Sequence, residues 1–300
     1  MSQQQREAIE AELRRPQPEA ESLATRRDGF AAYMATMHVP AGTRTSTTAI
    51  GGRPALSVEP EQGSRPGTIL YFHGGAWVLG SPRTAIALIT NLVVRTGVRG
   101  LSVDYRLAPE HPFPAAIQDG LAAYRELLDA GTDPASVVFA GDSAGGGLSV
   151  TTSLAARAAD LPLPAAIVAF SPAFDATLTG ASMDTKAGLD PIFNRESLAW
   201  LFDLYRAGQN PRQELLSPVI DADLSGLPPM LLQVGTDEVL LDDATRMATR
   251  AREASIDVVL DVVAGVPHVF QNYAGRLDEA DDALDRAALF IRQHLGGGIL

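Results

Sequence analysis

The chain of 300 residues has no cysteine, and positive charge is scarce in it. Without cysteine, a disulfide framework and a thiol nucleophile are excluded, and the absence fits a reducing compartment. Lysine and arginine together number 24 against 36 acidic residues, and Lys186 is the single lysine, so the formal net charge is −12. A chain with this charge repels polyanions and shows no basic stripe, so we expect no nucleic-acid partner.

Long apolar runs are also missing. No uninterrupted stretch approaches the roughly 20 residues that a membrane span needs. Residues Met1 to Ala20 are polar and charged, and they lack the apolar centre of a secretory signal. We therefore expect a cytoplasmic protein with no stable membrane anchor. The use of arginine for all positive charges but one favours a bacterial source. The hydrophobic content of 46% and the length are those of a globular protein that can bury a large core in a single domain, residues 1–300.

Short apolar runs rich in β-formers alternate with helical stretches along most of the chain. This alternation predicts βαβ units and a mostly parallel sheet. The predicted strands are Thr45–Ile50, Ala55–Glu59, Thr68–Phe72, Leu101–Asp104, Val137–Ala140, Ala166–Phe170, Met230–Val234 and Val258–Val263. The predicted helices include Thr84–Arg95, Ala115–Asp129, a helix after Ser143, and Asp278–Leu295.

The alternation stops between Phe174 and Leu227, where no strand is predicted. The interval contains instead an aromatic helical stretch, Leu198–Tyr205, flanked by loops rich in Gly, Asp and Pro. An insertion of this length between two strands is a candidate lid. Its aromatic side chains also suit a small core of the insertion itself, and we expect most of them to be structural.

The pentapeptide Gly-Asp-Ser-Ala-Gly occupies residues 141–145. It follows a predicted strand and precedes an Ala/Leu/Ser stretch that is typical of a helix. A strand, a tight turn bearing serine, and then a helix is the context in which G-x-S-x-G forms a nucleophile elbow. Ser143 is therefore the predicted nucleophile. The structural alternative is a serine that only caps the following helix.

A serine nucleophile needs a base, which in this topology follows the last strand. Only His268 lies in a loop just beyond a predicted strand, so it is the predicted base. The remaining histidines precede the serine or lie in the terminal helix: His38, His73, His111 and His294.

A carboxylate that orients the base is expected at the carboxyl end of Met230–Val234, where sheets of this class place their sites. The strand leads into Asp237 and Glu238. We predict Asp237, with Glu238 as its rival. The carboxylate would hold His268 in the tautomer that presents a bare nitrogen to Ser143, and would stabilise the imidazolium.

Residues 73–77 read His-Gly-Gly-Ala-Trp and directly follow the strand Thr68–Phe72. Adjacent glycines let backbone N–H groups approach a reacting oxygen without a Cβ in the way. We predict that Gly74, Gly75 and Ala144 donate to the oxyanion. An ordinary glycine turn is the alternative, but the pairing with the serine motif favours the functional interpretation.

These segments resemble the hormone-sensitive-lipase-like family of α/β-hydrolase esterases. The matching residues are 73–76, 141–146, Asp237, and the pair Pro267 and His268, and residues 104–115 are also similar to a stretch whose role in the family is chiefly structural. The resemblance extends from about Thr45 onward. One departure is Ala76, which stands where many members carry a third glycine; its N–H remains, so the oxyanion hole is expected to survive.

The resemblance implies an α/β-hydrolase fold with a cap formed by about residues 1–40 and about 176–211. It implies a serine carboxylesterase that acts on small to medium esters through an acyl-enzyme, with no cofactor and no metal. An N-acetyl hydrolase or a lactone hydrolase would use the same groups. A non-catalytic small-molecule receptor is disfavoured, because such receptors lack the base. A homodimer is left open, and Trp77 is expected either to line the pocket or to pack against the cap.

Overall fold

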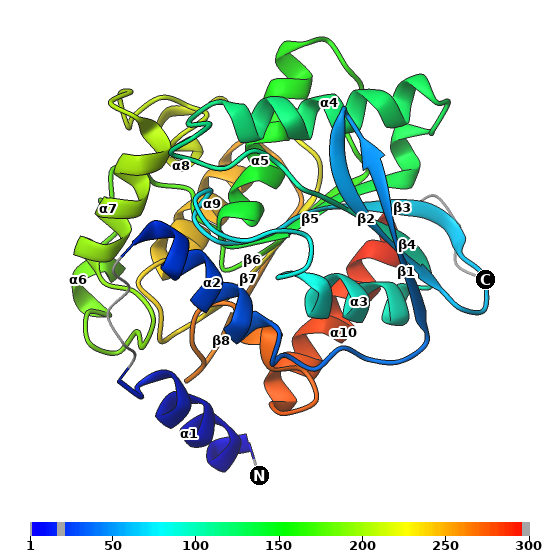
Figure 1. Cartoon of the computed structure of the whole chain (residues 1–300). Helices are drawn as coiled ribbons and strands as arrows, with labels where there is room; N and C mark the ends of the chain where they lie inside the picture. Colours follow the sequence, from blue (N-terminus) through cyan, green and yellow to red (C-terminus); the bar gives the residue numbers. More distant parts are fainter. Residues whose placement is uncertain (1, 17–21, 296–300) are drawn as a thin grey trace.

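Eight strands form one sheet in the order β1-β2-β4-β3-β5-β6-β7-β8 in the computed structural model, which describes residues 2–16 and 22–295 (Figure 1). β1 pairs with β2 and β2 with β4 in the antiparallel sense, and every other pairing is parallel. The predicted mostly parallel eight-stranded sheet is confirmed. The strands are β1 (Thr43–Ile50), β2 (Arg53–Pro60), β3 (Arg65–Phe72), β4 (Val98–Val103), β5 (Val137–Asp142), β6 (Ala166–Phe170), β7 (Met230–Gly235) and β8 (Val258–Val263).

Helices cover both faces of the sheet, as the alternating sequence predicts. The α-helices are α1 (Ser2–Leu13), α2 (Leu23–Met34), α3 (Ile86–Thr96), α4 (Ala115–Asp129), α5 (Ala144–Ala158), α6 (Ser182–Thr185), α7 (Arg195–Arg206), α8 (Pro218–Asp221), α9 (Leu241–Glu253) and α10 (Asp278–His294). Two short 3₁₀ helices, η1 (Pro134–Ser136) and η2 (Phe270–Tyr273), complete the described elements.

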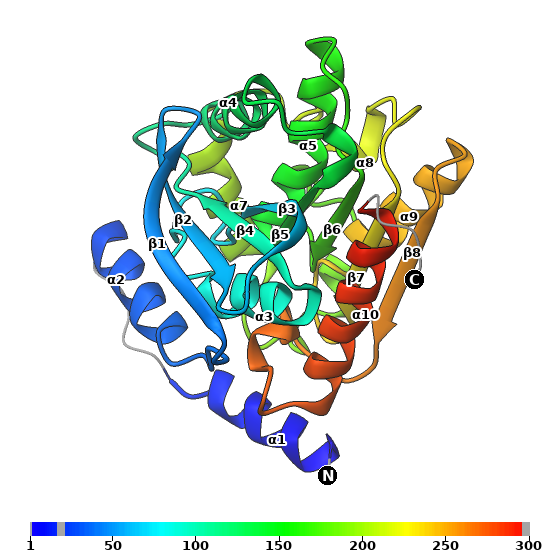
Figure 2. The ribbon, with the colours of Figure 1, turned by 90° about the vertical axis from the view of Figure 1, so that its right-hand side faces the viewer.

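The central strands are apolar because both of their faces are buried. Along β3, Leu70 and Phe72 pack in the same core cluster as residues of α4 and α5. Ile69 and Tyr71 alternate with them and pack toward α3 and α10. Figure 2 shows α4 and α5 on one side of the strands and α3 and α10 on the other. This double cover leaves the carboxyl ends of the parallel strands as the natural place for a site.

Between β6 and β7 the described chain forms α6, α7 and α8 and no strand, as predicted. α2, α6 and α7 lie on the same side of the molecule in Figure 1. The N-terminal helices reach the rest of the chain through arginines. Arg14 donates to the carbonyl oxygens of Gly188 and Leu189 at 3.1 and 2.8 Å, and Arg27 donates to those of Val78 and Ala108, both at 2.8 Å.

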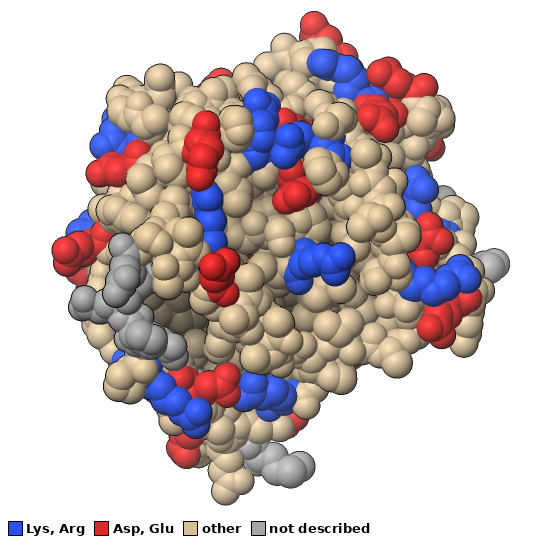
Figure 3. Space-filling model, in the orientation of Figure 1, with Lys and Arg blue, Asp and Glu red and all other residues tan. Residues whose placement is uncertain are grey.

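The surface drawn in Figure 3 shows acidic and basic side chains interspersed among uncharged ones. No helix in the described ranges combines the length and the apolar character needed to cross a membrane.

Candidate active site

Ser143 follows the buried strand β5 and immediately precedes α5, as the motif predicts. Its backbone angles are φ 52° and ψ −118°, a strained conformation for a residue with a side chain. Its N–H donates to the carbonyl oxygen of Phe170 at the end of β6, at 2.8 Å. The positive end of the α5 dipole lies at the same residue. Its side chain caps no N–H of α5, so the structure does not support the role of a helix-capping serine.

The glycines on either side of Ser143 are required by close backbone contacts. A Cβ at Gly145 would lie 1.9 Å from the carbonyl oxygen of Phe72, and one at Gly141 would lie 2.4 Å from the carbonyl oxygen of Gly145. Contacts this short do not occur for real Cβ atoms, so α5 can approach β3 and β5 only with glycine at both positions. The tight turn that exposes the serine therefore depends on packing as much as on backbone freedom.

The carboxylate at His268 belongs to Glu238, so the prediction of Asp237 is wrong. Oε2 of Glu238 accepts from Nδ1 of His268 at 2.7 Å, and Glu238 is fully buried. Asp237 is only half-buried, and its Oδ1 accepts from the hydroxyl of Thr236 at 2.9 Å. The two carboxylates leave the loop in different directions, and the inward one has the longer side chain.

Glu238 is held by two further donors on its other oxygen. Oε1 accepts from the N–H of Gly235 and from the hydroxyl of Ser171, both at 2.7 Å. The hydroxyl oxygen of Ser171 in turn accepts from the N–H of Val269 at 2.9 Å. Ser171 thus ties the carboxylate to the residue that follows His268. Ser171 is not among the predicted site residues, because a serine directly after a strand carries no distinctive signal.

Ser143 and the loop of His268 are anchored at two adjacent residues at the end of β6. Ser143 is bonded through its backbone to Phe170, and the loop of His268 is bonded to the next residue, Ser171. Among the described residues, Ser143 Oγ and His268 Nε2 have no hydrogen-bond partner, not even each other, and neither atom is sealed from solvent. Both atoms are therefore available to an incoming molecule.

Three carboxylates influence the imidazole of His268. Burial acts to lower its pKa, but the negative charges of Glu238, Asp190 and Asp142 outweigh burial, and the pKa is raised above its ordinary value of 6.5. The arrangement thus stabilises a positively charged imidazole, which is the form a base takes after it has accepted a proton.

The predicted oxyanion donor Gly74 is also wrong. Its N–H donates to Oδ1 of Asp142 at 3.0 Å, and a Cβ on Gly74 would lie 2.2 Å from Oδ2 of the same carboxylate. The carboxylate of Asp142 therefore leaves no room for a Cβ at residue 74, which explains the glycine there. The next two N–H groups, of Gly75 and Ala76, have no partner among the described residues, and both residues are partly exposed. Ala144, the first residue of α5, has no intrahelical acceptor for its N–H.

Asp142 and His73 hold the loop after β3, residues 73–77, through buried contacts. Oδ1 of Asp142 also accepts from the hydroxyl of Tyr71 at 2.8 Å, and burial raises the pKa of Asp142 to about 6. His73 stacks on Tyr105 with ring centroids 4.1 Å apart, and the Tyr105 hydroxyl donates to the His73 carbonyl at 2.7 Å. Burial lowers the pKa of His73 to about 4, so this histidine is neutral and structural.

Trp77 packs against the insertion. Its ring is stacked on that of Tyr205 at 4.4 Å and lies 5.3 Å from that of Phe202, both on α7. Only 5% of Trp77 is exposed. Of the two expected roles, the structure supports packing against the α7 segment.

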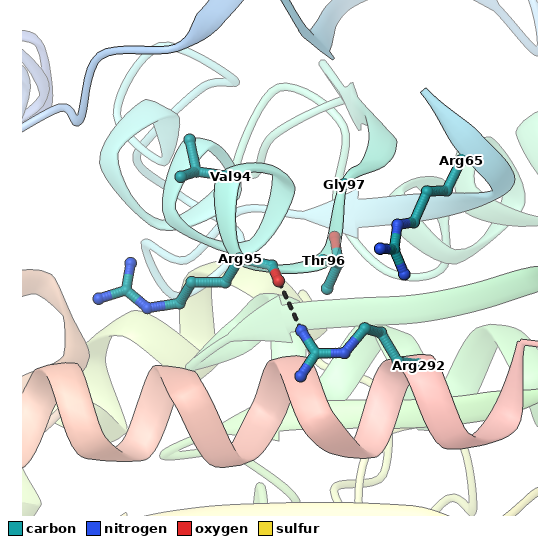
Figure 4. A pocket seen from close by; sticks show the side chains of 6 residues that line it. All are labelled: Arg65, Val94, Arg95, Thr96, Gly97 and Arg292. Atoms are coloured by element: carbon teal, nitrogen blue, oxygen red, sulfur yellow. Dashed lines mark hydrogen bonds between the residues drawn. The ribbon is translucent and has the colours of Figure 1, made fainter. Parts of the chain in front are cut away.

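The pocket in Figure 4 lies elsewhere. It has a volume of about 210 Å³ and is lined by Arg65, Val94, Arg95, Thr96, Gly97 and Arg292, from β3, α3, the turn after α3 and α10. None of the residues at the carboxyl ends of β5, β7 or β8 lines it, and it contains no nucleophile or base. This cavity is therefore separate from the predicted site at Ser143 and His268.

Comparisons with known proteins agree with the fold described above. Residues 69–272 match the model of a family described by the α/β-hydrolase fold. An acetyl-hydrolase from Streptomyces hygroscopicus is 42% identical over 77% of each chain. An esterase from Acinetobacter venetianus is 37% identical over 76% of each chain.

The solved structures extend the similarity over nearly the whole chain. An esterase of the bacterial hormone-sensitive lipase family superposes with a TM-score of 0.94 at 40% identity, covering 98% of this chain and 99% of that one. A hormone-sensitive lipase from a metagenome library also superposes with a TM-score of 0.94, at 36% identity over 99% of each chain.

Proposed function

Because this chain belongs to the bacterial hormone-sensitive-lipase family of α/β-hydrolase esterases and is a carboxylic-ester hydrolase, we propose that Ser143 is its nucleophile and His268 its general base. Ser143 Oγ attacks the ester carbonyl carbon while its proton passes to Nε2 of His268. Glu238 accepts from Nδ1–H and stabilises the imidazolium that forms. The observation that carries the proposal is this Glu238–His268 hydrogen bond, beside a strained serine with an available hydroxyl.

The oxyanion of the tetrahedral intermediate accepts from the N–H groups of Gly75, Ala76 and Ala144. Such donors each contribute about 3–4 kcal/mol to transition-state stabilisation. When the intermediate collapses, the C–O bond to the alcohol breaks and His268 returns the proton to the departing oxygen. A water molecule, deprotonated by His268, then attacks the acyl-enzyme and releases the carboxylic acid and free Ser143.

The substrates are esters of small to medium acids. The relative named as an acetyl-hydrolase supports a short acyl group. It also supports a second candidate function on the same groups, removal of an acetyl group from an amine.

The cap is also part of the proposal. About residues 1–40, of which 1 and 17–21 lie outside the described part, and about 176–211 would cover the site. Phe193 of this insertion supports the assignment, because its ring meets that of His268 edge-on at 5.1 Å.

Hydrolysis of 4-nitrophenyl esters from acetate to octanoate tests the function. Ser143→Ala and His268→Ala should each lower kcat by about a thousandfold or more, and a phosphonate should label the wild-type serine only. Ser153→Ala is the matched control, since that hydroxyl of α5 donates to the carbonyl of Ser149. Wild-type rates in Ser143→Ala would refute the proposal, and faster turnover of a matched acetamide than of the acetate ester would favour the second candidate.

A further inference from the structure

Asp190 is a buried carboxylate in the loop between α6 and α7, with 7% of the residue exposed. Its Oδ1 accepts from the N–H groups of Ile192 and Phe193 at 2.8 and 2.9 Å. Its Oδ2 accepts from the N–H of Val239 at 2.9 Å. One side chain thus joins two segments that are 49 residues apart in the sequence, namely the insertion and the loop after β7.

Both segments held by Asp190 adjoin the proposed base. Phe193 places its ring against the imidazole of His268, with ring centroids 5.1 Å apart and an interplanar angle of 78°. Val239 directly follows Glu238, whose carboxylate accepts from Nδ1 of the same imidazole. Displacement of the Asp190 carboxylate would therefore free the Phe193 ring that packs on His268. It would also free the backbone next to Glu238, the hydrogen-bond acceptor of His268.

A carboxylate is a costly choice for this position. Burying a charge is unfavourable unless hydrogen bonds replace the water that is lost, and here three N–H groups do so. Only a carboxylate accepts on both oxygens, whereas an amide would turn its NH₂ group toward one of these donors. The negative charge has a second consequence, because it acts on His268 across the site.

We propose that Asp190 is a positioning residue through which the insertion completes the catalytic base. With the insertion in place, Asp190 fixes Phe193 on the imidazole, fixes the loop of Glu238 and adds its negative charge to those of Glu238 and Asp142 near His268. The inference rests on the proposed function, and it makes the insertion part of the proton-transfer machinery in addition to being a cover.

The negative charge of Asp190 should affect the pH dependence of kcat/KM. The charged groups that act on His268 are Glu238 from the loop after β7, Asp142 from the end of β5, and Asp190 from the insertion. All three raise the pKa of His268. Only neutral His268 accepts a proton, so kcat/KM rises with pH through this pKa. Removing the charge of Asp190 lowers the pKa and moves the acid limb to lower pH.

The test compares Asp190→Asn with Asp203→Asn, which removes the same charge from an exposed position of α7. We expect Asp190→Asn to reduce kcat by about tenfold to a hundredfold and to move the acid limb of kcat/KM down by about half a pH unit. Asp203→Asn should leave both unchanged. Wild-type kcat, or a reduced kcat with an unshifted acid limb, would assign Asp190 a merely structural role and overturn the proposal.

A second variant covers the case in which Asp190→Asn does not fold. Phe193→Ala removes the half-buried ring and admits water to the imidazole. Water weakens both the burial that lowers the pKa of His268 and the carboxylate charges that raise it, so the acid limb should stay in place while kcat falls. Wild-type kcat for Phe193→Ala would overturn the proposal. Ser143→Ala distinguishes failure of the proposed function from failure of the role of Asp190. If Ser143→Ala retains activity, the proposed function fails. If Ser143→Ala is inactive and Asp190→Asn behaves like the wild type, only the role of Asp190 is rejected.

Discussion

Replacing Glu238 by glutamine removes one charge and keeps the size of the side chain. Three groups donate to this carboxylate: His268 Nδ1 on one oxygen, and Gly235 N–H and the Ser171 hydroxyl on the other. An amide offers only one acceptor atom, so its NH₂ group must face a donor on one side. If it faces His268, the imidazole takes the tautomer with its proton on Nε2, and Ser143 loses its acceptor.

Loss of the correct tautomer in a serine triad lowers kcat by about 10⁴. We therefore expect Glu238→Gln to lower kcat on 4-nitrophenyl butyrate by about 10³–10⁴, or about 4–5.5 kcal/mol of transition-state stabilisation. Asp237→Asn is the matched control in the adjacent position and should stay within about twofold of the wild type. Thermal unfolding of both variants shows whether the fold is retained.

Two results would refute this reasoning. A folded Glu238→Gln enzyme with more than about a tenth of the wild-type kcat would show that the carboxylate does not control the tautomer. An equal loss in Asp237→Asn would show that the loop rearranges and that Asp237 acts on His268 in the working enzyme.

Two further predictions concern the framework of the site. The pKa of His73 is lowered to about 4, so its contribution to stability is complete above the unfolded-state pKa of about 6.5 and is lost as pH falls from there toward 4. Urea unfolding should show the wild type losing about 2–3 kcal/mol more than His73→Asn between about pH 7 and pH 4.5, and equal losses would contradict this. Gly145→Ala places a Cβ 1.9 Å from the Phe72 carbonyl oxygen, so it should lower the free energy of unfolding by about 3 kcal/mol or more. Gly29→Ala in α2, where a Cβ meets nothing within 4 Å, is the control and should leave that free energy unchanged or raise it by up to about 1 kcal/mol. Similar melting temperatures for the two variants would argue against the close contact of α5 with β3.

The strands and helices were predictable because their patterns are set by burial. β6 and α4 begin and end at the predicted residues. β6 is recognised from its buried apolar run, and α4 from the helical spacing of its apolar residues. The choice between Asp237 and Glu238 has no such signal. A loop has no periodicity, so the direction of each side chain is decided by what it packs against.

The same reason explains the error at Gly74. The sequence shows that glycines follow β3, but which N–H points outward depends on Asp142, whose side chain occupies the space beside Gly74. The extent of the cap, the homodimer and the cytoplasmic location stay predictions.

The place of the proposed base in the fold has a consequence for how the enzyme fails on heating. His268 follows β8, which lies at the edge of the sheet and is paired with β7 on its inner side. Val259 and Val262 on this strand are 50% and 42% exposed. Marginal strands with little cover fray at free energies well below that of global unfolding. Catalysis should therefore cease at temperatures where circular dichroism still reports an intact protein, and cooling should restore it.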